Sequence, residues 1–437
     1  MKRSGLRICG LLMAAAAAAT AAAAQAQEFK FDASAFERKR FEYSGYAELK
    51  AEHLPLNRDG AFYKINFYDK TKRDSIHRNV ATLMPSGKLR LGDSTTMNMR
   101  AHLDMQRDSL TRARTSRFDE AYLSYKPSAG FTLEAGKSSM KWGKGYAWNP
   151  AGLVERPKDP NDPELAREGF TTLSADFIRN FEGPLQTVAF TPLLLPVSKG
   201  INSDFGATGH VNVAGKLYLL YRDTDIDFMY LNSGSRSRRF GMDISRNLGA
   251  NLEVHGEWAR AQNVMRPLTD ARGNVTQVTA NATSYLAGAR YLSDIETTYI
   301  VEYYRNGAGY TPQQSADYYG FVESGVAQFN ANGNSSLLQK ASVLAQGAYG
   351  RPNAGKNYLY FRAVQKEPFD MLYLSPALTL IENLDDRSRS LVPEVLYTGY
   401  TNVELRVRAF FLSSGAQTEF GEKQNSKRFE LLARFYF

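Results

Sequence analysis

Histidine and cysteine side chains are the first candidates for chemistry, because they transfer protons, act as nucleophiles or bind metal ions. The 437 residues include one cysteine and five histidines: His53, His77, His102, His210 and His255. None of the histidines lies near a serine-containing hydrolase signature. No glycine-rich stretch matches a phosphate-binding loop, and nothing indicates nucleic-acid binding. We therefore predict no catalytic residue and no cofactor.

One histidine sits between two carboxylates. Glu253, His255 and Glu257 share one face of an alternating segment. Residues two apart on a strand are roughly 6.6 Å apart, too far for that trio alone to hold one metal ion. We predict no metal site.

Charged residues instead follow a period of two. The apolar residues at odd positions from Met97 to Met105 alternate with polar residues at even positions from Asn98 to Gln106. The same pattern runs through 252–258 and 403–411. Alternation of this kind predicts strands with one apolar and one charged face. Mean hydropathy is -0.41, and the one long apolar run lies at the start of the chain, which excludes a polytopic helical membrane protein.

That run has the features of a signal peptide. Lys2, Arg3 and Arg7 precede the apolar stretch 10–24, and Ala24-Gln25-Ala26 has the small-x-small pattern of a cleavage site. We predict that residues 1–26 are removed on export. The loss takes away Cys9 and three basic residues, leaving 51 basic against 45 acidic residues, a charge of +6. An exported chain without thiols fits the periplasm or outer membrane of a Gram-negative cell.

Short turns and long connections alternate along the chain. Eight short turns join strand-like runs, at 92–95, 127–130, 180–183, 223–225, 247–250, 293–296, 367–370 and 399–401. Longer connections lie at about 54–79, 141–168, 192–214, 261–283 and 306–355. This asymmetry predicts an all-β fold, a transmembrane antiparallel β-barrel of about 18 strands, with 16 as the alternative. The barrel would occupy 41–437 with short periplasmic turns and long extracellular loops, after a periplasmic lead-in at 27–40.

The C-terminal strand carries a second export feature. Phe429, Leu431, Ala433, Phe435 and Phe437 alternate with polar residues and end the chain on an aromatic. This resembles the recognition signal that the barrel assembly machinery reads in Gram-negative outer-membrane proteins, with Phe437 as its last residue. The hairpin Phe118 to Lys137 resembles hairpins of substrate-selective porins, including phosphate-selective porin-like proteins. The resemblance implies an outer-membrane channel in contact with lipid.

The most distinctive loop begins at Lys141-Trp-Gly-Lys-Gly-Tyr-Ala-Trp-Asn-Pro150. Gly143 and Gly145 permit close backbone approach, so the loop can fold inward and constrict the pore. It would then offer stacking faces and a cation to a solute, from Trp142, Lys144, Tyr146 and Trp148. The alternative is a surface loop whose aromatic residues belong to the outer girdle.

Charged faces must point into the lumen, because a charge facing lipid at mid-bilayer costs about 2–4 kcal/mol. The basic candidates come from the first and last strands: Lys50, Lys88, Arg90, Arg100, Arg406, Arg408, Arg428 and Arg434. Acidic candidates come from the facing wall: Asp227, Asp243, Glu253 and Glu257. Opposed walls favour small anions as cargo. Cross-strand ion pairs are the alternative explanation.

The function expected from these features is passive or facilitated diffusion of small hydrophilic, in particular anionic, solutes. Two alternatives remain. The lead-in from Phe29 to Tyr46 faintly resembles those of barrels that surround a periplasmic or extracellular cytochrome, which would make the chain a sheath or secretion conduit with a periplasmic partner. An outer-membrane hydrolase is the other alternative.

Overall fold

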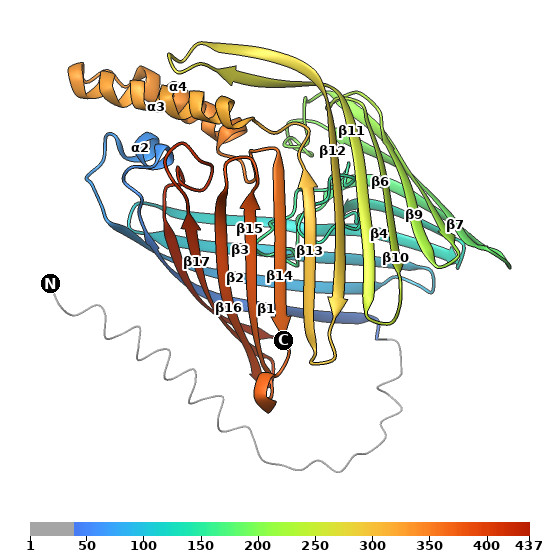
Figure 1. Cartoon of the computed structure of the whole chain (residues 1–437). Coiled ribbons are helices and arrows are strands. Elements are labelled where there is room, and N and C mark those ends of the chain that lie inside the picture. Colours follow the sequence, from blue (N-terminus) through green and yellow to red (C-terminus); the bar gives the residue numbers. More distant parts are fainter. Residues whose placement is uncertain (1–38) are drawn as a thin grey trace. The chain divides into compact units, whose positions relative to one another are not determined.

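The computed structural model describes residues 39–437, which form eighteen strands in one antiparallel sheet (Figure 1). The first nine are β1 (Phe41–Pro55), β2 (Ser75–Arg90), β3 (Thr95–Asp108), β4 (Arg112–Ser128), β5 (Phe131–Ser138), β6 (Phe170–Asn180), β7 (Leu185–Val197), β8 (His210–Tyr221) and β9 (Thr224–Leu231). The others are β10 (Arg239–Asn247), β11 (Leu252–Thr269), β12 (Val275–Leu292), β13 (Thr297–Arg305), β14 (Asn357–Gln365), β15 (Leu374–Asn383), β16 (Ser388–Tyr400), β17 (Val403–Ser413) and β18 (Lys427–Tyr436). The signal peptide predicted at 1–26, and the lead-in as far as residue 38, lie outside the described residues.

The sheet closes on itself. Each strand pairs with its neighbour in the sequence, and β1 pairs with both β2 and β18. Glu48 on β1, for example, stands opposite Arg434 on β18. The prediction of an 18-stranded antiparallel barrel is therefore confirmed, and β1 and β18 have no free edge.

Alternation separates an outer from an inner face of the barrel. On β3, Leu103 and Met105 are exposed, whereas His102 and Asp104, which alternate with them, hydrogen-bond to one another. On β17, exposed Val407 alternates with buried Glu404 and Arg408. Apolar outer residues around polar inner ones match the needs of a strand between lipid and water.

All eight predicted short turns join consecutive strands. One predicted loop is wrong: 261–283 is mostly strand, because β11 and β12 continue past an irregular register between Ala261 and Val264 and turn only at 270–274. The loops predicted at about 54–79 and 306–355 contain helices instead of irregular chain: α2 (Ala61–Phe67), α3 (Pro312–Asn332), α4 (Ser336–Leu344) and the π-helical turn η3 (Ala345–Tyr349). A short 3-10 turn, η4 (Pro368–Asp370), lies between β14 and β15.

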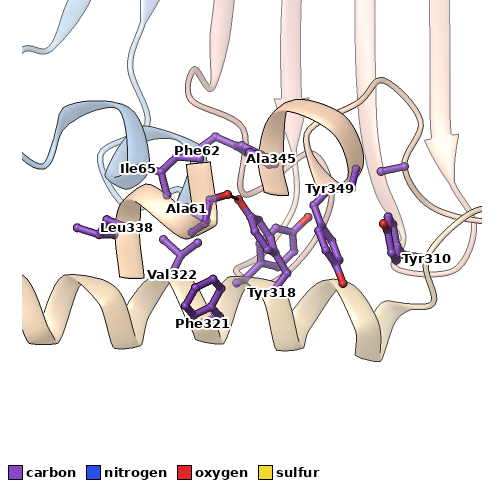
Figure 2. Close-up of a cluster of buried hydrophobic side chains, with 14 residues drawn as sticks. Ala61, Phe62, Ile65, Tyr310, Tyr318, Phe321, Val322, Leu338, Ala345 and Tyr349 are labelled. Carbon is purple, nitrogen blue, oxygen red and sulfur yellow. Dashed lines mark hydrogen bonds between the residues drawn. The ribbon is translucent and has the colours of Figure 1, made fainter. Parts of the chain in front are cut away.

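These helices pack together at the long-loop end of the barrel (Figure 1). Figure 2 shows their apolar core, in which Phe321 and Val322 of α3 lie near Ala61 of α2 and Leu338 of α4. Thr311 begins α3 with a capping box that it forms with Gln314. We call this unit the helical cap. None of the helices in residues 39–437 is both long and apolar enough to cross a membrane.

Candidate functional site

The segment between β5 and β6, residues 139–169, crosses the barrel interior; we call it the inner loop. Its first part is bound by two inner-face carboxylates. Glu257 on β11 accepts hydrogen bonds from the backbone N–H groups of Gly145 (2.5 Å) and Ala151 (2.8 Å). Glu302 on β13 accepts one from Ala147 at 2.8 Å. Buried carboxylates that receive several N–H groups hold a backbone firmly in place.

The second part of the inner loop reaches a different region of the barrel wall. Asp162 Oδ2 lies 3.3 Å from Arg408 Nη1 and 3.4 Å from Arg406 Nη1, both on β17. The Asn161 carbonyl also accepts a hydrogen bond from Arg408, at 3.3 Å. The loop is therefore fastened to β11 and β13 on one side and to β17 on the other.

Local sequence explains how the chain comes so close to these carboxylates. Gly143 has φ +95°, a conformation that favours glycine, and a Cβ there would lie 2.8 Å from Glu257 Oε1. A Cβ on Gly145 would lie 2.2 Å from the Trp148 carbonyl oxygen. Both positions therefore require glycine.

The two tryptophans of the loop are buried. Trp142 packs with Leu153 and Val154 of the same loop. Trp148 stacks on Tyr304 of β13, with ring centroids 5.1 Å apart. The structure places both rings against the barrel wall and the loop itself, so their role as stacking faces for a solute stays a prediction.

Lys144 and Tyr146 also have partners. Lys144 Nζ lies 3.2 Å from Asp227 Oδ2 on β9, so this cation is paired. The Tyr146 N–H donates to Glu302, and its ring lies 6.0 Å from that of Tyr360. These two residues, which are predicted to contact a solute, thus mainly attach the inner loop to the barrel wall.

Glu155 organises the middle of the loop. It accepts hydrogen bonds from the Trp142 N–H and, at 3.0 Å, from the Asn149 amide, and it lies 2.8 Å from Arg167 Nη1. Burial raises its pKa to about 7, against the opposing effect of Arg167. Burial and Arg167 also lower the pKa of Lys158. Glu155 is therefore a carboxyl in the barrel interior that changes charge near neutral pH.

All eight basic residues predicted on the lumen side alternate with outer residues and lie on the inner face. Most of them contact carboxylates. The pairs are Arg90–Glu42 (2.5 Å), Arg100–Glu120 (3.2 Å), Arg406–Glu404 (2.7 Å), Arg408–Glu430 (2.6 Å), Arg428–Glu52 (3.8 Å) and Arg434–Glu48 (2.6 Å). Lys50 and Lys88 form no ion pair within residues 39–437. Cross-strand pairing, the alternative explanation, thus accounts for five of the six arginines, whereas Arg406 pairs with Glu404 on its own strand and with Asp162 of the inner loop.

The four acidic candidates lie on the inner face as well. Asp243 on β10 and Asp227 on β9 stand directly opposite one another. Lys144 of the inner loop forms an ion pair with Asp227. Glu257 binds loop N–H groups, as described above. Glu253 accepts a hydrogen bond from Ser245 at 3.3 Å. Of the four, Glu257 and Asp227 are held by the inner loop.

The inner histidines bind carboxylates. His102 lies between Asp104 (2.6 Å) and Asp119 (3.0 Å), and Arg117 lies 2.8 Å from Asp119. His255 Nε2 lies 2.8 Å from Glu302. Neither imidazole hydrogen-bonds to a serine within residues 39–437.

A cavity of about 860 Å³ lies between the inner loop and the long-loop end of the barrel; we call it the vestibule. Its cationic lining residues are Lys158, Arg236, Arg239, Arg260, Arg351 and Lys423. None of them forms an ion pair with a carboxylate in the described part of the chain. The Nε atoms of Arg239 and Arg351 are buried and have no hydrogen-bond partner within residues 39–437.

The vestibule carboxylates, in contrast, are mostly engaged. Glu155 is paired with Arg167. Glu419 accepts hydrogen bonds from the Ala354 N–H (3.1 Å), the Asn383 amide (2.8 Å) and the Tyr358 hydroxyl. Asp159 is the third acidic lining residue. The vestibule therefore carries a net positive charge.

Sequence reasoning missed Glu302, Asp162 and the vestibule arginines. Glu302 could have been found, since Ile300, Glu302 and Tyr304 alternate with outer residues on β13 as Glu253 and Glu257 do on β11. Arg236 and Arg351 lie in connections outside the strands, where no periodicity predicts direction. Asp162 lies in a proline-rich stretch with no regular pattern.

Comparison with known structures places the fold. OccK5 (OpdH) of Pseudomonas aeruginosa superposes with a TM-score of 0.53 at 10% identity, covering 91% of this chain and 98% of that one. A double variant of OccD1 (OprD) gives a TM-score of 0.52 at 10% identity, covering 92% and 97%. No protein-family model and no curated protein matches the chain. The chain has the fold of outer-membrane porins.

Proposed function

We propose that the chain is an outer-membrane channel that passes small anionic solutes, with the vestibule as the site that attracts them. The observation that carries this proposal is the imbalance of its lining. Six cations there lack an ion-pair partner among the described residues, while two of three carboxylates are held by other groups. A cavity lined by one sign of charge concentrates ions of the opposite sign and raises their rate of entry.

Individual lining residues support this assignment. Arg239 is half-buried, and Arg236 lies over the Phe205 ring, 4.0 Å from its centroid. Burial lowers the pKa of Arg236 to about 10, so it remains charged at neutral pH. Guanidinium groups that carry charge without a carboxylate partner are available to a carboxylate or phosphate group of a solute.

The inner loop argues against the sheath alternative. A barrel that encloses a cytochrome needs a free interior, whereas here Glu257 and Arg408 hold residues 139–169 across it. For the hydrolase alternative, the inner histidines contact carboxylates without a nearby nucleophile among the described residues. The channel is the function best supported. The roles of Phe437 in assembly and of the lead-in in partner binding stay predictions.

The test is the reversal potential of the purified protein in a planar bilayer under a KCl gradient. We expect anion preference in the wild type and a clear decrease in Arg236→Gln/Arg239→Gln. Arg246→Gln/Arg222→Gln removes the same charge at the short-turn end, where both residues are exposed, and should keep most of the anion preference. Cation preference in the wild type, or equal losses in both variants, would overturn the proposal.

A further inference from the structure

Three arginines stand together on the outer face of the barrel. Arg107 on β3 and Arg112 on β4 are directly opposite each other, and Arg114 lies two residues further along β4, opposite Met105. Met105 is exposed on the outer face, as are Leu103 and Phe118 on the same two strands. Since paired residues share a face of the sheet, all three arginines point away from the lumen. We call them the arginine triad.

The triad lies where the apolar surface ends. Outer-face residues of β3 are apolar from Met97 to Met105, a stretch of roughly 26 Å along the strand at about 3.3 Å per residue. Strands of such barrels tilt by roughly 35–45°, so this stretch covers about 20 Å of the apolar band, about 25 Å tall, that meets lipid tails. Arg107 is the next outer residue beyond it, towards the long-loop end. This places the guanidinium groups at the level of lipid headgroups.

No carboxylate of residues 39–437 neutralises the triad. All three arginines are exposed, and none forms an ion pair or hydrogen bond with another side chain within residues 39–437. The nearest acidic residue in sequence, Asp108, belongs to the inner face, where it lies 3.6 Å from Arg78 and binds the N–H groups of Leu110 and Thr111. On β2, Arg107 stands opposite the uncharged Asn79.

Like charges directly opposite on a sheet are destabilising unless an anion lies between them. Here the Asp108 turn fixes the hairpin, so Arg107 and Arg112 cannot separate easily. Guanidinium groups bind phosphate through paired hydrogen bonds. The apolar surface beside Met105 suits acyl chains. Both features match one molecule, a lipid whose headgroup carries phosphate.

We propose that the arginine triad is a binding site for a phosphorylated lipid of the outer leaflet, with the phosphate between the guanidinium groups and the acyl chains along β3 and β4. The site lies on the opposite face of the wall from the lumen, so the inference does not depend on ion selectivity. The attraction involved is the electrostatic one that draws basic residues to anionic lipid headgroups in other membrane proteins.

The experiment uses the full-length protein in detergent with lipopolysaccharide as the probe, and binding is measured by native mass spectrometry. We expect Arg107→Gln/Arg112→Gln/Arg114→Gln to bind at least 10-fold more weakly than the wild type. The control variant Arg179→Gln/Arg222→Gln/Arg246→Gln removes three exposed cations near the short turns and should bind as the wild type does. Heat-modifiable electrophoretic mobility verifies that each barrel is folded.

Two further arms identify the ligand chemistry. Lipopolysaccharide without its phosphates should bind the wild type as weakly as intact lipopolysaccharide binds the triple variant. Inorganic phosphate at the same concentration should leave lipopolysaccharide binding unchanged; full displacement would indicate a site for free phosphate and overturn the lipid assignment. Equal binding by the wild type and the triple variant would overturn the site itself. Arg107→Lys/Arg112→Lys/Arg114→Lys keeps the charge and should retain part of the binding.

Discussion

Asp162 in the inner loop lies 3.3 Å from Arg408 on β17. This contact joins the loop to β17, six strands round the barrel from Glu257 on β11, so the two parts of the loop are attached to different regions of the wall. It also partly neutralises an arginine that the alternating pattern of β17 points into the lumen. The same contact therefore sets both loop position and local charge.

Asp162→Asn should increase anion preference in the proposed channel, because it removes a negative charge next to Arg406 and Arg408. Arg406→Ser/Arg408→Ser should decrease it. Both effects are measured as shifts of reversal potential under a salt gradient. Asp223→Asn, a charge-matched change at an exposed short turn, is the control. If Asp162→Asn leaves the reversal potential at the wild-type value, the contact lies away from the ion path.

Glu257→Ala should loosen the inner loop. It leaves the N–H groups of Gly145 and Ala151 without their acceptor, at a cost of about 1–3 kcal/mol for each buried group. Single-channel recordings should show larger and noisier openings. Glu253→Ala, on the same face of β11 but bound to Ser245 rather than the loop, should behave like the wild type. Unchanged openings in Glu257→Ala would show that Glu302 and Asp162 suffice to hold the loop.

The fold could be read from the sequence because period-two alternation and short turns are local signals. Strand pairs such as β17 and β18 follow directly from their alternating residues, and all eight short turns were found. The inner loop could not be placed, because its position depends on Glu257, Glu302 and Arg408, which are distant from it in sequence. Alternation predicts one face for arginines 406, 408 and 434, but it does not show which carboxylate each one meets.

The helical cap likewise could not be placed from local sequence signals. Tyr310, Tyr349 and Tyr318 stack in that order, with centroids 4.1 and 4.4 Å apart, between segments that no strand pattern describes (Figure 2). Arg351 follows this stack and lies 5.8 Å from the Tyr310 ring. The position of a vestibule cation therefore depends on packing of aromatic residues far from the strands.

Phe321→Ala should destabilise the helical cap by about 3–5 kcal/mol. Phe321 of α3 is fully buried in the core that α3 shares with α4, next to the 270–274 turn. Limited proteolysis should cut within 306–356 much faster than in the wild type, while heat-modifiable mobility stays the same. Val343→Ala, at a residue of α4 that is 70% exposed, should change cutting little. Equal protection in both variants would mean that the cap does not depend on this core.

Anion preference should rise as pH falls through about 7. Glu155 has its pKa raised to about 7 by burial, so it is ionised at pH 8.5 and neutral at pH 5.5. Protonation removes one negative charge from a vestibule whose cations stay charged, which makes the vestibule more positive. The reversal potential of the wild type, measured at both pH values in the same salt gradient, should therefore shift towards the anion at pH 5.5.

Glu155→Gln isolates this titration. The variant should show, at pH 8.5, the anion preference that the wild type reaches only at pH 5.5, and the difference between the two pH values should largely vanish. Asp159→Asn removes another vestibule carboxylate without changing Glu155, so it should raise anion preference at both pH values and keep the wild-type pH dependence. A Glu155→Gln channel with full pH dependence would assign the titration to another group.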